Sequence, residues 1–278
     1  MADVYREASV REAARLPADA LPRFMQETRG QLVRWLIHLR REPFNLLFAL
    51  VQPVILLVFF GGALQRFGAP ISPGGNYRAF ILPGILALTV FGNSMAGGIP
   101  VLFDKESGFL ARLITAPVTR SSILVSRFLA INLLSVLQCL IMLTLAALFF
   151  GVRVASGAAG VAALLGIGLL LGFGVTIISL ILAFSLTGHG DFFALLGIIT
   201  LPLSFLSSAF VPLDVMPGWM RWLAVLNPMT YAIDSMRALV LGGSELWSGG
   251  LLLRCCAALT AFDAAMLILG TSLLRRRL

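Results

Sequence analysis

A stretch of twenty residues in the middle of the chain, numbers 104–123, reads DKESGFLARLITAPVTRSSI and separates two long apolar segments. It contains the only lysine of the protein, Lys105. Its apolar residues recur at helical spacing until Pro117, which predicts a short amphipathic helix ended by a proline. Asp104 and Glu106 precede this helix, where negative charge suits the positive end of a helix. We therefore expect a polar, partly helical connection at a membrane surface.

The composition indicates that most of the chain lies in a lipid bilayer. Of the 278 residues, 59% are hydrophobic and 12% are charged, whereas soluble domains carry about a quarter charged residues. The net charge of +8 comes from arginines that cluster beside apolar segments, which favours a membrane surface over nucleic acid as their partner. The three cysteines lie in or beside apolar segments without the spacing of metal ligands, so we expect no metal site.

Six apolar segments are long enough to cross a bilayer, which takes about 20 residues. The sequence therefore predicts an all-α membrane protein with six transmembrane helices in one domain, residues 44–278. Fifteen of the 21 lysines and arginines fall on the side of the N-terminus, and this bias favours cytoplasmic positions for both termini. The predicted spans are residues 44–64, 79–103, 123–150, 157–186, 192–212 and 251–274.

The chain before the first span divides into two parts. Residues 1–28 have scattered charges and no apolar core of a signal peptide, and they predict a mobile cytoplasmic tail. Residues 29–43 predict an amphipathic interfacial helix, with Leu32 and Trp35 in its apolar arc. Pro43 ends this helix and lets the chain turn into the bilayer. The helix either has a task of its own or is a plain anchor, and the pattern fits both interpretations.

The connection at residues 104–123 also has two interpretations. It is a docking helix for a cytoplasmic partner, or it is a well-formed loop without a partner. Most inner loops are shorter and less patterned, which favours docking. The candidate contact residues are Glu106, Phe109, Leu110, Leu113, Pro117 and Arg120.

The segment between the fifth and sixth spans contains turn signals followed by a helical pattern. From residue 229 onward the apolar residues share one face, while Thr230, Asp234 and Arg237 share the other, and Asp234 and Arg237 are spaced to form an ion pair. We expect a short re-entrant or interfacial helix pair on the outer side, which either shapes an exit for a cargo or plugs the ends of the spans. The candidate exit residues are Asn227, Pro228 and Tyr231.

Asp263 lies midway along the last predicted span, where an ionisable group is costly and marks a candidate functional site. It is either part of a proton relay or an acid that bonds to a neighbouring helix. The sequence offers no second mid-span acid or histidine for a relay, which favours the second interpretation. In the fourth span, Gly168 and Gly172 have GxxxG spacing, which predicts close helix packing within the subunit.

The sequence argues against an enzyme. A phosphate-binding P-loop requires Gly-Lys-Ser/Thr, and the only lysine follows Asp104. The two histidines, His38 and His189, cannot form a HExxH zinc site. We expect no catalytic residue, cofactor or metal in this chain, and we expect any ATP and Mg²⁺ to be bound by a separate polypeptide.

The chain resembles the type-2 ABC transporter permeases, the transmembrane subunits of daunorubicin-resistance, nodulation and polysaccharide exporters. The resemblance rests on the spacing of three stretches, which are residues 40–53, 106–120 and 212–231. It implies a multi-pass protein of the bacterial plasma (inner) membrane that pairs with a cytoplasmic ABC ATP-binding subunit and with a second permease copy, as a homodimer. It also implies that Glu106, Leu113, Pro117 and Arg120 belong to a coupling helix that docks on the ATPase.

These observations predict the permease subunit of an ATP-driven exporter. Its substrate would be an amphipathic, lipid-like or drug-like molecule that leaves the cytoplasm or the inner leaflet. One alternative is an ion-coupled secondary transporter that uses Asp263, although such transporters show internal repeats that this sequence lacks. The other alternative is a non-transporting membrane scaffold, which needs no coupling helix.

Overall fold

The computed structural model describes residues 20–41, 43–63, 65, 76–108, 120–186, 188–242 and 250–274. Within these ranges every regular element is a helix, which confirms the all-α class. The elements in chain order are α2 (Ala20–Arg41), α3 (Pro43–Ala63), α5 (Tyr77–Ala96), α6 (Ile99–Glu106), α8 (Arg120–Phe150), α9 (Gly157–Ser185), α10 (His189–Phe205), the 3₁₀ turn η2 (Leu213–Val215), α11 (Gly218–Leu226), α12 (Pro228–Leu241) and α13 (Gly250–Leu274).

Four stretches of the described chain are long and apolar enough to cross a membrane: Tyr77–Glu106, Val125–Phe150, Gly157–Ser185 and Gly250–Ser272. Two further apolar stretches are shorter: Ala49–Ala63, which is part of α3, and His189–Phe205, which is the whole of α10. With 17 residues, α10 is about 25 Å long at roughly 1.5 Å per residue, less than the ~30 Å of a hydrocarbon core. The predicted end of the fifth span at residue 212 is wrong, because α10 ends at Phe205. The six-span arrangement stays a prediction.

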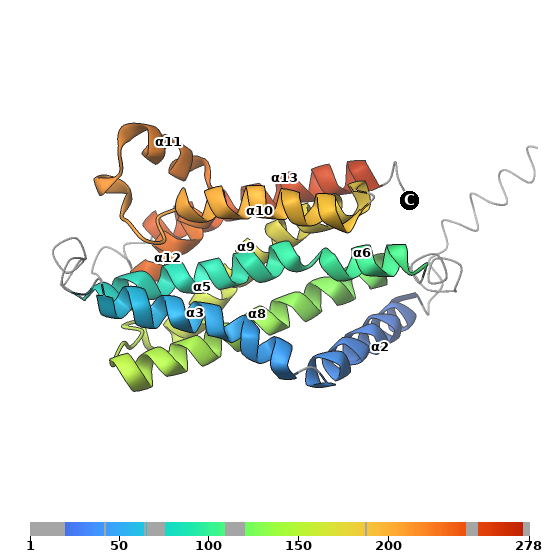
Figure 1. Cartoon of the computed structure of the whole chain (residues 1–278), viewed down its shortest axis with the longest axis horizontal. Helices are drawn as coiled ribbons and strands as arrows, with labels where there is room; N and C mark the ends of the chain where they lie inside the picture. Colours follow the sequence, from blue (N-terminus) through green and yellow to red (C-terminus); the bar gives the residue numbers. More distant parts are fainter. Residues whose placement is uncertain are drawn as a thin grey trace, which may run out of the picture.

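Helices α5 and α9 form the centre of the bundle, and α11 and α12 lie at the end opposite α6 (Figure 1). α5 packs against α3, α8, α9 and α12, and α9 also packs against α13. Large apolar side chains such as Phe80, Ile85 and Leu171 are fully buried in this centre. α10 packs mainly against α5 and keeps Ile198 and Leu201 exposed. It is therefore a peripheral helix with one uncovered apolar face.

The second predicted span is divided into α5 and α6 by a break at Gly97-Gly98. Such a break leaves backbone groups without intrahelical partners, and Ser179 of α9 satisfies two of them. The Ser179 hydroxyl donates to the Met95 carbonyl (2.5 Å) and accepts from the Gly98 amide (2.8 Å). A Cβ at Gly98 would lie 2.6 Å from the Ser179 carbonyl oxygen. The glycine therefore permits the close approach that keeps the break satisfied.

Gly168 and Gly172 of α9 lie at contacts with other helices, as their spacing predicts. A Cβ at Gly172 would lie 2.6 Å from Asn132 Oδ1 of α8 and 3.2 Å from Ser94 Oγ of α5. A Cβ at Gly168 would meet its neighbours only at an ordinary 3.5 Å. Close packing of α9 against α5 and α8 therefore depends on Gly172 more than on Gly168.

The amphipathic N-terminal helix is longer than the sequence pattern predicts. α2 begins at Ala20, so residues 20–28 of the predicted tail are helical, while residues 1–19 lie outside the described part of the chain. α2 ends at Arg41 and α3 begins at Pro43. The proline thus stands at the first position of the new helix, where its missing N–H is tolerated.

One side of α2 packs against α8. The Trp35 ring lies 4.7 Å from the Arg127 guanidinium of α8, in a cation–π contact. Ser126 of α8 donates a hydrogen bond to Gln31 (3.4 Å). Val33 and Ile37, in contrast, remain exposed. The predicted apolar arc is therefore shared between a contact with α8 and an uncovered surface.

Candidate functional site

The last turn of α6 is held by three neighbouring helices. Asp104 pairs with Arg127 of α8, and Glu106 Oε1 lies 2.5 Å from Nδ1 of His189 at the start of α10. Lys105 Nζ donates to the carbonyl of Leu186 (2.8 Å), just after α9. We call these five residues, Asp104, Lys105, Glu106, Arg127 and His189, the α6-end cluster. It ties one end of α6 to α8, α9 and α10.

Asp104 and Glu106 lie in the last turn of α6, and the helix that the sequence predicts after them falls in residues 109–119, outside the described part of the chain. Negative charge is unfavourable at the C-terminal end of a helix. The ion pair of Asp104 with Arg127 and the contact of Glu106 with His189 offset this cost, which explains why an acidic pair is tolerated here.

The predicted docking residues fall mostly outside the described chain. Phe109, Leu110, Leu113 and Pro117 belong to residues 109–119, which the structure does not describe. Glu106 ends α6 before this gap, and Arg120 begins α8 after it. The two helices that flank the segment are therefore known, and its docking role stays a prediction.

At the opposite end of the bundle, Asn227 joins two helix termini. Its Oδ1 accepts from the Met229 amide (3.0 Å) and so caps the start of α12. Its Nδ2 donates to the carbonyls of Leu203 (2.7 Å) and Leu206 (3.0 Å), which the end of α10 leaves without helical partners. Pro228 follows at the first position of α12. One buried amide side chain thus fixes α10 to α12.

Arg237 forms a second tie at the same end. Its Nε donates to the Phe80 carbonyl of α5 (3.2 Å), its Nη2 to the Ser208 carbonyl (2.5 Å), and its Nη1 to Asp234 Oδ1 (3.0 Å). Ser208 also donates its hydroxyl to Asp234 (2.7 Å). We call Arg237, Asp234 and Ser208 the Arg237 clamp. The clamp holds the loop after α10 against α5 and α12.

The clamp confirms the predicted pairing of Asp234 with Arg237 but corrects the predicted polar face of α12. Thr230 and Arg237 are buried, because α12 packs against α5, α9 and α13 rather than lying on a surface. Burial raises the pKa of Asp234, whereas the neighbouring Arg237 acts to lower it. Tyr231, the third predicted exit residue, is half-buried against the core.

Asp263 of α13 is buried against α9 at Gly174. A Cβ at Gly174 would lie 2.5 Å from Asp263 Oδ1 and would overlap the Phe262 ring. Asp263 Oδ1 has no hydrogen-bond partner within the described part of the protein. The glycine therefore provides the space that the carboxyl group occupies, and both interpretations of Asp263 stay predictions.

A cavity of about 440 Å³ lies between α3, α5 and α10. Its walls are mainly apolar, as in most sites for small molecules, and the volume is in their usual range of roughly 300–1,000 Å³. The described residues that line it include no ionisable side chain. Its polar lining residues are Gln52, Thr89, Asn93, Thr200 and Ser204.

Several residues of these sites escaped the sequence analysis. His189 entered the sequence analysis only when a zinc site was excluded. Arg127 pairs with a residue 23 positions earlier in the chain, and no local spacing rule links such residues. Gln52 and Asn93 are visible as polar groups in apolar spans, but only the packing of α3, α5 and α10 brings them to one cavity.

Comparison with known proteins identifies the family. Residues 30–241 match the model of the ABC-2 type transporter family. The ycf38 transport permease of Cyanophora paradoxa is 36% identical over 230 residues, covering 82% of this chain and 79% of the relative. The daunorubicin resistance ABC transporter permease protein DrrB1 of Streptomyces coeruleorubidus is 27% identical over 259 residues, which cover 93% of this chain and 89% of the relative. The chain therefore belongs to the ABC-2 type transporter family, as a membrane-spanning transporter permease.

Proposed function

We propose that this chain is the permease subunit of an exporter driven by ATP hydrolysis on a separate cytoplasmic subunit. In this proposal, two permease copies enclose a pathway, and an ATP-binding subunit docks on the segment between α6 and α8. The cargo is an amphipathic, drug-like or lipid-like molecule that leaves the cytoplasm or the inner leaflet. The chain contains no P-loop sequence, which supports a separate site for ATP and Mg²⁺.

The observation that carries the proposal is the contact between Glu106 and His189. Glu106 ends the helix that leads into the docking segment, and His189 begins α10, a wall of the cavity. The rings of Phe103 and His189 also contact each other, with centroids 4.2 Å apart. A push on the docking segment would therefore reach α10 through direct contacts. Because α10 is peripheral, it can move without disrupting the centre of the bundle.

The lining of the cavity supports an amphipathic cargo without a strong charge. Apolar walls favour apolar groups, and the amide and hydroxyl groups of Gln52, Asn93 and Thr200 can orient a hydrogen-bonding group of the cargo. Thr200 Oγ1 is buried without a hydrogen-bond partner in the described structure. A buried polar atom of this kind gains when a ligand satisfies it.

The uncovered faces of α3 and α10 support a second permease copy. Ile55 and Phe59 of α3 and Ile198, Leu201 and Phe205 of α10 are large, apolar and exposed. These two helices also form walls of the cavity. A second copy that covers them would close the cavity from the open side.

Transport by reconstituted protein tests the proposal. Vesicles would hold the permease with its ATP-binding subunit, and ATP-dependent accumulation of daunorubicin would be followed by its fluorescence, the probe being suggested by the name of a relative. Thr200→Val should weaken cargo affinity roughly fivefold, the effect of one hydrogen bond of about 1 kcal/mol. Thr144→Val is the matched control, because Thr144 is exposed on α8 and bonds only its own helix.

A second pair of measurements separates coupling from binding. Glu106→Gln removes the carboxylate that contacts His189, and it should lower the amount of cargo moved per ATP hydrolysed while the ATP-binding subunit still co-purifies. Unchanged transport in this variant would contradict the proposed route. Transport that needs no ATP, follows a proton gradient and disappears in Asp263→Asn would instead establish the secondary transporter.

A further inference from the structure

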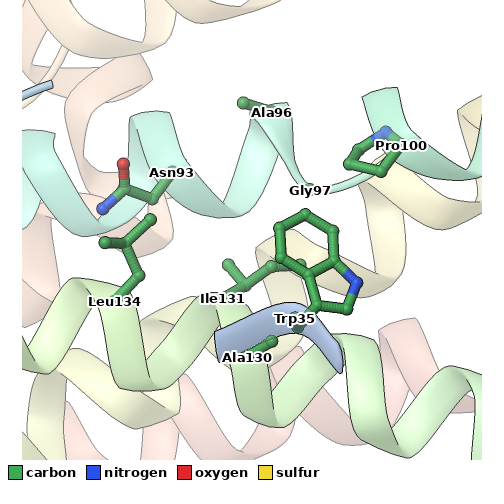
Figure 2. A pocket seen from close by; sticks show the side chains of 8 residues that line it. All are labelled: Trp35, Asn93, Ala96, Gly97, Pro100, Ala130, Ile131 and Leu134. Carbon is green, nitrogen blue, oxygen red and sulfur yellow. The ribbon is translucent and has the colours of Figure 1, made fainter. Parts of the chain in front are cut away.

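A groove of about 150 Å³ lies where α2 crosses the break between α5 and α6. In Figure 2 the Trp35 ring of α2 stands beside Gly97 and Pro100 at the break, with Ile131 of α8 close by. Asn93 lies farther along α5 at the other end of the groove. The groove is separate from the cavity that α10 closes, although Asn93 contributes to both.

The groove follows from how the helix break is satisfied. Ser179 of α9 binds the free backbone groups of the break from one side, so the opposite side, toward α8 and α2, is left as a concave surface. A side chain at Gly97 would overlap Ile131. The glycine backbone therefore forms the floor of the groove, and Trp35 covers it.

The groove presents carbon atoms to its occupant. Asn93 directs its amide nitrogen to Ser135 (3.1 Å) and Gln138 (2.6 Å) of α8, so these donors are already engaged. The other lining residues, apart from the Trp35 ring nitrogen, bring no side-chain polar atom. At roughly 30 Å³ for a group the size of one water or methylene, the space holds about five methylene groups. These properties suit a segment of an alkyl chain and not a polar headgroup.

The surroundings of the groove are strongly basic. The sequence of α2 contains five arginines and one glutamate. Arg127 lies over the Trp35 ring, and Arg34 is close enough to Arg127 to repel it electrostatically. An amphipathic helix with such a charge attracts anionic lipids of the leaflet on which it lies.

We propose that this groove binds one acyl chain of an anionic phospholipid, which the net positive charge of α2 attracts. The lipid completes the contact between α2, α8 and the α5–α6 break, next to the α6-end cluster. Lipid composition would then affect how firmly α2 holds this end of the bundle. The site requires α2 to lie at a membrane surface, and it goes beyond the proposed transport function without depending on it.

Quenching of Trp35 fluorescence by brominated lipid tests the site in the full-length chain. Trp219, Trp222 and Trp247 are replaced by phenylalanine, so that Trp35 is the only tryptophan. The protein is placed in phosphatidylcholine bilayers that contain an equal fraction of dibrominated phosphatidylglycerol or dibrominated phosphatidylcholine. We expect Trp35 to be quenched more strongly by the anionic lipid than by the neutral one with the same chains.

Two variants with matched controls make the result specific. Ala130→Leu fills the groove and should abolish the difference between the two lipids, whereas Ala147→Leu on an exposed part of the same helix should preserve it. Arg34→Gln should lower the preference for anionic lipid by roughly fivefold, as expected for one arginine at a membrane surface. Arg153→Gln, exposed near the opposite end of α8, is its control.

Equal quenching by both lipids in the unsubstituted groove would overturn the proposal, since it would indicate ordinary boundary lipid. Quenching by neither lipid would also overturn it, because an alkyl chain in the groove must contact Trp35. A preference that Ala130→Leu leaves unchanged would mean that the lipid binds elsewhere. No ATP-binding subunit takes part in this experiment, so its outcome is independent of the transport assay.

Discussion

Replacing Arg237 by methionine should destabilise the folded protein by about 3 kcal/mol, the lower end of the range for breaking a buried ion pair. The variant keeps the apolar stem of the side chain but removes the three guanidinium nitrogens that donate hydrogen bonds to Phe80, Ser208 and Asp234. The carboxylate of Asp234 and two backbone carbonyls thereby lose their hydrogen bonds to Arg237. The largest cost comes from Asp234, whose charge loses its compensating cation.

The size of the effect follows from the exposure of the two side chains. Arg237 is 10% exposed and Asp234 is 28% exposed, so water can hydrate the orphaned carboxylate only in part. Asp234 keeps one hydrogen bond from Ser208, which places the estimate at the lower end of the range. Asp234→Asn leaves the Arg237 cation without a counter-ion, but it should cost less, because two backbone carbonyls still accept hydrogen bonds from that cation. The double variant should be more stable than the sum of the two single effects predicts.

Resistance of the detergent-purified protein to denaturant, read by pulse proteolysis, measures these differences. The control is Arg221→Met, which breaks a pair with Asp214 at 3.7 Å in the segment between α10 and α12, where the two side chains are 56% and 89% exposed. Such exposed pairs contribute little, so no measurable change is expected. If Arg237→Met behaves like this control, or if the single effects simply add, the clamp does not act as a buried ion pair.

The same variant should show a distinct dependence on pH. Without Arg237, burial raises the pKa of Asp234 further above its unfolded value. An acid with a raised folded pKa destabilises the protein when ionised, and this cost is relieved as the pH falls through that pKa. The difference in the free energy of unfolding between Arg237→Met and the unsubstituted protein should therefore become smaller as the pH falls. A difference that grows would contradict the assigned role of Asp234.

Three further predictions concern helix contacts. Gly174→Ala should lower the apparent melting temperature, because its Cβ would overlap a phenyl ring of α13, while Gly166→Ala, with nothing within 4 Å, should not. Gly84→Ala should make the loop after α10 more accessible to protease, since the new Cβ would lie 2.5 Å from a backbone oxygen of that loop. The control is Gly62→Ala, which should leave the cleavage unchanged because no atom lies within 4 Å of the added Cβ. Asn227→Ser keeps a cap for α12 but cannot reach α10, so α10 should gain faster amide exchange at its end while α12 does not.

Local patterns in the sequence were sufficient for the helices and for pairs of residues on one helix. The apolar runs locate the spans because a bilayer core requires about 20 apolar residues whatever the neighbours are. The pairing of Asp234 with Arg237 follows from helical spacing alone. Pro43 marks a boundary between two helices, although it begins α3 rather than ending the helix before it as predicted. The end of α10 was missed, because an apolar loop and an apolar helix have the same composition.

The sequence by itself determined that this is an all-helical membrane protein, since hydropathy and helical period are properties of neighbouring residues. The tertiary structure alone decided which distant groups meet. In the folded chain the polar face of α12 is buried, Asn227 bonds to the end of α10, and Glu106 contacts His189. The physical reason is that these contacts depend on how whole helices pack against each other. The spacing of residues along the chain predicts contacts within one helix, but it does not predict contacts between distant helices.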